Sequence, residues 1–256
     1  MKRVLAAGIV IGLLAISDGR AEDGSGCPAP AYLLSTESQL PKVAAAIKAD
    51  KRLNILVVGS GSSALAGPDG INASYPARLE AALRDKLPGV AVSVKTDLRP
   101  KKLASEAAES FGPLLDKLPP DQKPALVIWQ TGTVDAIRSI DPDDFRSALE
   151  SGVGALQKTS ADVLLMNLQY NPRMETMLSV APYNDTIRVV AQQLDVPMFD
   201  RFSIMRYWND AGDFDLFGPV HGFGMAKRVH DCIGRSLSAM IVEASRINPA
   251  ELRIQR

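Results

Sequence analysis

Two glycine-flanked stretches of the chain hold side chains suited to nucleophilic chemistry. The first is ILVVGSGSSALAG (Ile55–Gly67), which contains Ser60, Ser62 and Ser63. The second is FGPVHGFG, which contains His221, one of only 2 histidines in the sequence. A serine hydroxyl is a weak nucleophile until a neighbouring base takes its proton, and histidine is the usual base. A fold that brings the two stretches together would therefore form a serine–histidine pair.

The first stretch also matches the G-x-G-x-x-A pattern of a dinucleotide-binding turn. That function needs a helix that begins at the glycines, so that its N-terminus faces the pyrophosphate. Here Gly67–Gly70 (GPDG) interrupts such a helix, and the helical pattern begins only near Ser74. The acidic residue expected about 20 residues further on is also missing, because the nearest candidate, Asp97, lies nearly twice as far along. The sequence argues against nucleotide binding.

Apolar runs alternate with amphipathic segments through most of the chain. The runs predict strands at Leu53–Gly59, Val90–Thr96, Ala125–Thr131, 161–169 and 196–200. The longer segments predict helices that include Gln39–Asp50, a stretch from Ser74, Tyr183–Leu194 and Met225–Ala244. This alternation is typical of a parallel sheet covered on both faces. We expect one three-layer α/β/α domain with a five-stranded, flavodoxin-like sheet that binds ligands beyond the carboxyl ends of its strands.

Four blocks, taken in order, resemble the SGNH (GDSL-like) hydrolase family. The blocks are ILVVGSGSS, YPARLEAAL, LVIWQTGTVDA and GPVHGFG, and the resemblance spans about Leu53 to Ile241. It implies a five-stranded α/β/α protein that hydrolyses esters, often O-acetyl or acyl groups. It also implies a nucleophilic serine after the first strand, oxyanion donors after the second and third strands, and a histidine before the last helix.

The family's nucleophile position allows more than one alignment here. Aligned from ILVVG, Gly61 falls on the nucleophile, which a glycine cannot be. With a shift of two residues, GSSALAG resembles GDSLTAG and Ser63 becomes the nucleophile. Ser62 lies between these positions and takes the role if the turn is rebuilt. In the structural alternative, the serines only cap the following turn through side-chain hydrogen bonds.

The histidine block keeps its base but not the base's usual partner. His221 stands where the family has its catalytic histidine, whereas Gly218 replaces the aspartate three residues earlier. Asp215 is the candidate that orients His221, with Asp213 as a second possibility. His230 falls inside the last predicted helix, where we expect a structural role.

The family's oxyanion donors are replaced. No glycine follows the second predicted strand, and Val134 stands where the asparagine of the third block belongs. Asp135 matches the aspartate that ends this block, and we expect it to hold the loop through backbone hydrogen bonds. The substitute donor candidates are Gly61, Gln130, Thr131 and Thr133. Since one missing donor typically lowers the rate by about 10²–10³, these substitutes decide whether the site is active.

The N-terminus has the features of a secretory signal peptide. Lys2 and Arg3 precede an apolar run, Val4–Ile16, and small residues follow, so we expect cleavage after Ala21. The run of about 13 residues is shorter than the roughly 20 that span a bilayer as a helix. The predicted organisation is a signal peptide (1–21), an arm and helix (22–50), the hydrolase-like domain (51–245) and a tail (246–256). The mature protein would be periplasmic or secreted, without stable membrane insertion.

The 2 cysteines, Cys27 and Cys232, lie far apart in the sequence. In an oxidising compartment such a pair favours a disulfide. Neither a CxxC spacing nor a histidine cluster is present, so we expect no metal site and no cofactor. The 29 basic and 29 acidic residues balance, which argues against a nucleic-acid partner.

The sequence thus supports two functions from different classes. The first is an exported SGNH-like esterase or deacylase that acts on a carbohydrate or cell-envelope ester through a serine–histidine mechanism. The second is a non-catalytic module that uses the same cleft to bind an envelope glycan or a protein. The replaced oxyanion donors keep both hypotheses open.

Overall fold

The computed structural model describes residues 20–21, 26–67, 69–217 and 222–254. Within them, five parallel strands form one sheet in the order β4-β3-β5-β6-β7. The strands are β3 (Arg52–Gly59), β4 (Ala91–Leu98), β5 (Leu126–Gln130), β6 (Asp162–Met166) and β7 (Met198–Phe199). This is the strand order of flavodoxin-like sheets. The predicted three-layer fold and all five predicted strands are confirmed.

The central strands are apolar because helices cover both of their faces. Every residue of β5 and β6 is buried, as expected for parallel strands inside an α/β protein. The edge strand β4 is instead mostly half-buried or exposed. β3 pairs with β5 from Ile55–Val58 to Leu126–Trp129. This register brings the carboxyl ends of β3 and β5 side by side, which places the serine stretch next to the end of β5.

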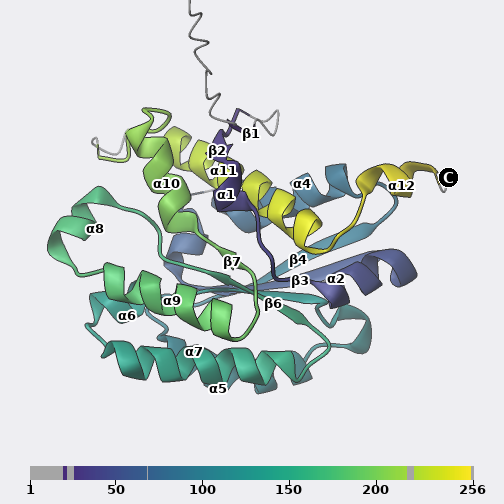
Figure 1. Ribbon diagram of the computed structural model, residues 1–256, viewed down its shortest axis with the longest axis horizontal. Coiled ribbons are helices and arrows are strands. Elements are labelled where there is room, and N and C mark those ends of the chain that lie inside the picture. The colour runs from purple at the N-terminus through teal and green to yellow at the C-terminus, as the bar shows by residue number, and fades with distance from the viewer. Residues whose placement is uncertain (1–19, 22–25, 68, 218–221, 255–256) are drawn as a thin grey trace, which may run out of the picture.

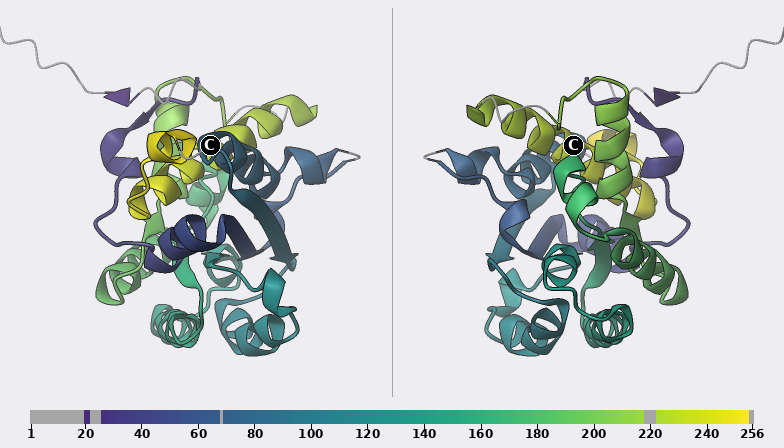
Figure 2. Two further views of the ribbon diagram at one scale, coloured as in Figure 1. Left: turned by 90° about the vertical axis from the view of Figure 1, so that its right-hand side faces the viewer. Right: turned by 90° about the vertical axis from the view of Figure 1, so that its left-hand side faces the viewer.

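Helices form the two outer layers (Figures 1 and 2). On one face lie α4 (Tyr75–Lys86) and α11 (Gly222–Ala244), which pack against each other. On the other face, α7 (Pro142–Gln157) packs against both α5 (Ala104–Asp116) and α9 (Ala181–Gln193). The shorter helices are α1 (Ala31–Leu34), α2 (Pro41–Ala45) with a π turn over Ala46–Asp50, α3 (Gly70–Ala73), α6 (Thr133–Ile137), α8 (Pro172–Met177), α10 (Arg201–Asp210) and α12 (Pro249–Ile254).

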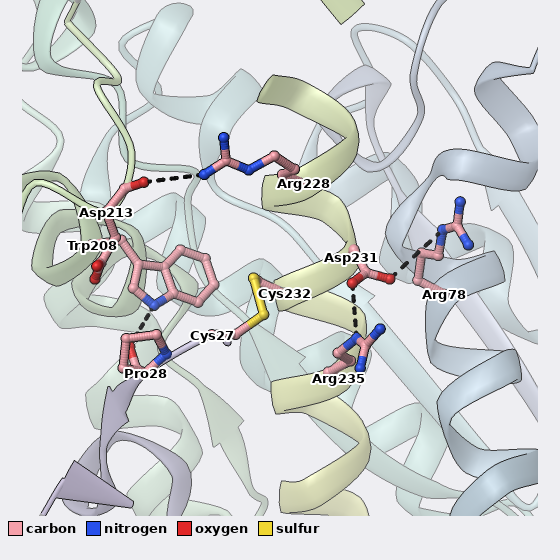
Figure 3. The surroundings of a disulfide bond; sticks show 9 residues. All are labelled: Cys27, Pro28, Arg78, Trp208, Asp213, Arg228, Asp231, Cys232 and Arg235. Carbon is pink, nitrogen blue, oxygen red and sulfur yellow. Dashed lines mark hydrogen bonds and ion pairs between the residues drawn. A yellow bond between two sulfur atoms is a disulfide. The ribbon is translucent and has the colours of Figure 1, made fainter. Parts of the chain in front are cut away.

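The structure confirms the predicted disulfide. Cys27, in the N-terminal arm, is bonded to Cys232 in the middle of α11 (Figure 3). Beside it, the indole Nε1 of Trp208 donates a hydrogen bond of 2.7 Å to the carbonyl of Pro28. The arm is therefore attached to α11 covalently and to α10 through an indole. A disulfide of this kind is typical of proteins in oxidising compartments.

Most of the predicted signal peptide lies outside the described residues. Only Arg20–Ala21 is described, as a short strand, β1, that pairs antiparallel with β2 (Ala29–Pro30). The cleavage site after Ala21 stays a prediction, as do the boundaries of the domain and the tail. In the part of the chain that the structure describes, no helix is both long enough and apolar enough to cross a membrane.

Candidate active site

The serine stretch forms a tight turn at the carboxyl end of β3. A 3-10 turn, η2 (Gly61–Ser63), begins directly after Ser60, and the Ser63 amide donates to the Ser60 carbonyl at 3.0 Å. Gly59 is required by close packing, because a Cβ there would lie 2.7 Å from Ser63 Oγ and 3.0 Å from Gln130 Oε1. The last residue of β3 therefore leaves room for the turn to fold back onto the end of β5.

Gln130, the last residue of β5, holds this turn in place. Its Oε1 accepts hydrogen bonds from the Ser60 amide at 3.0 Å, from Ser63 Oγ at 2.9 Å and from Ser60 Oγ at 3.2 Å. Ser62 Oγ lies further away, at 3.4 Å. The side-chain Nε2 of Gln130 is buried and has no hydrogen-bond partner among the described residues. The oxygen of this amide therefore accepts several hydrogen bonds, while its nitrogen donates none to the described residues.

The three serines differ in exposure. Ser63 is fully buried, and its hydroxyl lies 3.1 Å from the Tyr75 hydroxyl as well as against Gln130. Ser60 is buried too, at 7% exposure. Ser62 is half-buried, and its hydroxyl makes only long contacts of 3.4 to 3.5 Å. Ser62 is thus the most exposed of the three serines, and its hydroxyl is the most loosely held.

Three of the predicted oxyanion donors lie at one small cavity beside the turn. Its free volume is about 10 Å³, and its lining includes Ser60, Gln130, Thr131 and Thr133. Thr133 Oγ1 is buried without a partner among the described residues, like Gln130 Nε2. A cavity of this size holds about one water-sized group. Gly61, the remaining donor candidate, is exposed at the start of η2.

The loop after β5 is held as the sequence suggested. The buried carboxylate of Asp135 accepts a hydrogen bond of 3.0 Å from the amide of Ala104, the first residue of α5. Burial raises the pKa of Asp135, while bonds from backbone amides lower it. Asp135 therefore connects α6 to the start of α5 and fixes the wall of the cavity.

His230 belongs to the buried support of the site. Its Nδ1 accepts a hydrogen bond of 2.9 Å from the amide of Tyr75, the first residue of α4. Burial, and then the positive charge of Arg201, lower the pKa of His230 to about 4. His230 is therefore neutral at neutral pH and joins α11 to α4 behind the serine turn. This agrees with the structural role expected from its place in the helix.

Arg201 is a fully buried cation beside the turn. It is the first residue of α10, and its Nη2 lies 3.5 Å from Ser62 Oγ. Its Nε and Nη1 have no hydrogen-bond partner among the described residues. Burial lowers the pKa of Arg201 to about 10, and the interaction with Tyr75 partly opposes this shift. The guanidinium stays protonated at neutral pH.

The predicted base cannot be placed against the serines. His221 and Gly218 lie outside the described residues. Asp215 is exposed in the loop after α10, where its carboxylate accepts a hydrogen bond of 3.2 Å from the Phe217 amide. Asp213 is exposed in the same loop. The pairing of Ser62 or Ser63 with His221 and Asp215 therefore stays a prediction.

Sequence reasoning missed Arg201 because it overlooked α10. The signal was present, since Arg201 precedes Ile204, Met205 and Trp208 at helical spacing and all four are buried on one face. The short β7 ends two residues before Arg201, at the edge where parallel sheets bind ligands. Among the described residues, no group of three histidine, cysteine or acidic side chains is placed to hold a metal ion.

A family model described as the non-GDSL lipase-like family matches residues 26–247, which is most of the chain. The protein belongs to this family. Its architecture is that of the SGNH hydrolases, as the sequence resemblance implied. A search of curated proteins found no match.

Solved structures of hydrolases share the fold of this non-GDSL lipase-like protein. TesA is 21% identical, covering 75% of this chain and 99% of its own, with a TM-score of 0.59. AlinE4, an SGNH-hydrolase family esterase, is 22% identical over 69% and 90% of the two chains, with a TM-score of 0.52. Axe2, an acetyl-xylooligosaccharide esterase of Geobacillus, is 15% identical over 74% and 94%, with a TM-score of 0.55.

The family's description fits the serine turn. The chain reads Gly-Ser-Gly-Ser-Ser at Gly59–Ser63, without the aspartate–serine pair of a GDSL motif. A Cβ at Gly61 would meet no atom within 4 Å, so packing does not require glycine there. In the alignment from ILVVG, glycine stands at the family's nucleophile position, with Ser60 and Ser62 on either side of it.

Proposed function

We propose that the protein is an exported ester hydrolase whose nucleophile is Ser62. The proposal rests on how Ser60, Ser62 and Ser63 differ in burial and in the hydrogen bonds of their hydroxyls. Ser60 and Ser63 are buried and bonded to Gln130, whereas the Ser62 hydroxyl is half-buried and loosely held. Its position after β3, at the carboxyl edge of the sheet, is the binding edge of doubly wound folds.

In the proposed reaction, His221 takes the proton of Ser62 as the oxygen attacks the ester carbonyl carbon. The carbonyl oxygen becomes an oxyanion, and the collapse of this intermediate releases the alcohol with the proton returned by His221. Water, deprotonated by the same base, then attacks the acyl-serine and releases the acid. The role of His221 rests on its place before α11 in the sequence, and Asp215 remains the proposed partner that orients it.

Gln130 and Thr133 are the proposed oxyanion donors in place of the missing asparagine. Each contributes a buried donor that has no partner in the described part of the chain, at the edge of the same cavity of about 10 Å³. A buried donor left unpaired typically costs about 1–3 kcal/mol. An oxyanion in the cavity would satisfy both donors in the transition state only, which is how such donors accelerate acyl transfer.

The proposed substrate is an acyl ester on a carbohydrate or another component of the cell envelope. The likeness to Axe2, named as an acetyl-xylooligosaccharide esterase, supports an acylated sugar, and the disulfide supports an envelope or extracellular location. The non-catalytic alternative, a module that binds an envelope glycan or protein, is favoured by Gly61 at the simplest nucleophile position and by Val134 in place of the asparagine.

Turnover of p-nitrophenyl acetate by the mature protein tests the proposal. We expect Ser62→Ala and His221→Ala to lower the rate to that of buffer, and Gln130→Glu to lower kcat by about 10²–10³. The Gln130→Glu variant is informative because a carboxylate keeps the acceptor that holds the turn but removes the Nε2 donor. Wild-type turnover no faster than buffer would favour the non-catalytic module.

A further inference from the structure

Arg201 is a buried charge that no carboxylate among the described residues balances. Its side chain is fully buried, yet two of its three guanidinium nitrogens have no partner among the described residues. An arginine carries five N–H donors, and among the described residues the only hydrogen-bond acceptor of this guanidinium is Ser62 Oγ, at 3.5 Å. An ion removed from water without a partner costs several kcal/mol. Because this charge lies at the edge where parallel sheets bind ligands, its cost to stability suggests that a bound group balances it.

The neighbouring groups do not supply the missing negative charge. Asp200 precedes Arg201 in sequence, but its carboxylate accepts bonds from Asn167 and Ser203 and pairs with Arg188 at 3.4 Å. The groups that interact with Arg201 through their charges are the hydroxyl of Tyr75 and the imidazole of His230.

Neither of these groups is an anion. Burial raises the pKa of Tyr75 above its usual value, so its hydroxyl stays protonated at neutral pH. His230 is neutral and uses its Nδ1 to accept from a backbone amide. The guanidinium therefore faces the serine turn with its charge uncompensated by any described side chain.

We propose that Arg201 is a binding site for an anionic group, a carboxylate or a phosphate, carried by the ligand of this protein. The guanidinium is planar and presents paired N–H donors that match the two oxygens of either group. Ser62 is half-buried and lies next to Arg201, so the anion approaches from the Ser62 side. An oxyanion there would compensate the buried charge.

The inference deepens the proposed function. If Ser62 is the nucleophile, the substrate is an acidic ester that carries its carboxylate or phosphate close to the scissile bond. This substrate class rests on the proposed hydrolysis, whereas the anion site itself does not. Measuring anion binding by Ser62→Ala tests the anion site separately from the proposed hydrolysis, because this variant lacks the proposed nucleophile and keeps Arg201.

Anion binding is measured by calorimetry and by the melting temperature, with inorganic phosphate and acetate titrated at constant ionic strength. We expect wild type and Ser62→Ala to bind an anion and to melt at a higher temperature with it. Arg201→Met should bind at least about tenfold more weakly, since a hydrogen bond to a charged group contributes about 1.5–3 kcal/mol. Stronger binding of phosphate or of acetate identifies which group the ligand carries.

The matched control is Arg206→Met, on the same helix. Arg206 is half exposed and pairs with Glu175 at 3.3 Å, so this variant should bind the anion like wild type. Without anion, Arg201→Met should melt no lower than wild type, because it removes an unpaired buried charge. Equal anion binding by Arg201→Met and wild type would overturn the proposal. The proposal would also be overturned if wild type bound neither phosphate nor acetate. This measurement does not depend on whether Arg201→Met folds.

Discussion

His230 makes the stability of the fold depend on pH. In the folded protein its Nδ1 accepts from the Tyr75 amide and its pKa is about 4, through burial first and Arg201 second. In the unfolded chain the pKa of a histidine is about 6.5. Between these two values the unfolded state binds a proton that the folded state does not, so the free energy of unfolding falls as the pH decreases.

The size of this effect follows from the two pKa values. For a group with pKa values of about 6.5 unfolded and about 4 folded, the free energy of unfolding falls by about 2 kcal/mol between pH 7 and pH 5. Asp135 and Asp162 act in the opposite direction, because burial raises their pKa values in the fold. The contribution of His230 must therefore be isolated by a variant that changes only this residue.

His230→Asn is that variant, since its Oδ1 can accept from the Tyr75 amide but does not titrate. Urea unfolding, followed by tryptophan fluorescence at pH 7 and pH 5, gives the free energy of unfolding of both proteins. We expect wild type to lose about 2 kcal/mol more than His230→Asn on acidification. Parallel losses in the two proteins would refute the buried, neutral state of His230 and its contact with α4.

Two further predictions concern the fold. The double variant Cys27→Ser/Cys232→Ser should lose about 5 kcal/mol in urea unfolding, because the bond joins residues 205 apart and constrains the unfolded chain; a midpoint equal to that of the oxidised wild type would contradict this. Gly152→Ala should destabilise by about 1–3 kcal/mol, because its Cβ would lie 2.5 Å from Trp129 Cζ3. On the same helix, Gly154→Ala meets no atom within 4 Å and should stabilise by up to about 1 kcal/mol. Equal melting temperatures for Gly152→Ala and Gly154→Ala would contradict this prediction, because they would show that α7 leaves room for a methyl group beside Trp129.

The sheet was predictable because its signals are local. Runs such as Leu53–Gly59 and Ala125–Thr131 are continuously apolar, which is what burial on both faces requires. The disulfide was predictable from the expectation of a signal peptide and from the number of cysteines. The helix α8 was missed because its 6 residues are too few for a helical period to stand out, whereas the helical spacing of α10 is present in the sequence but directly follows an apolar run.

The candidate site was predictable in position but not in detail. The sequence placed the serine stretch after the first strand of the sheet, and the structure puts it at the carboxyl edge of β3. Which hydroxyl is accessible depends on how the 3-10 turn rotates against Gln130, and this is a tertiary contact. The burial of Arg201 away from any described carboxylate is likewise not visible in a sequence whose charges balance overall.

Covalent labelling tests most directly whether Ser62 is a nucleophile. The mature protein is treated with a fluorophosphonate, and the modified peptide is located by mass spectrometry. We predict one adduct, on Ser62, that is absent from both Ser62→Ala and His221→Ala. An unlabelled wild-type protein, or an adduct on Ser60 or Ser63 instead, would contradict the assignment.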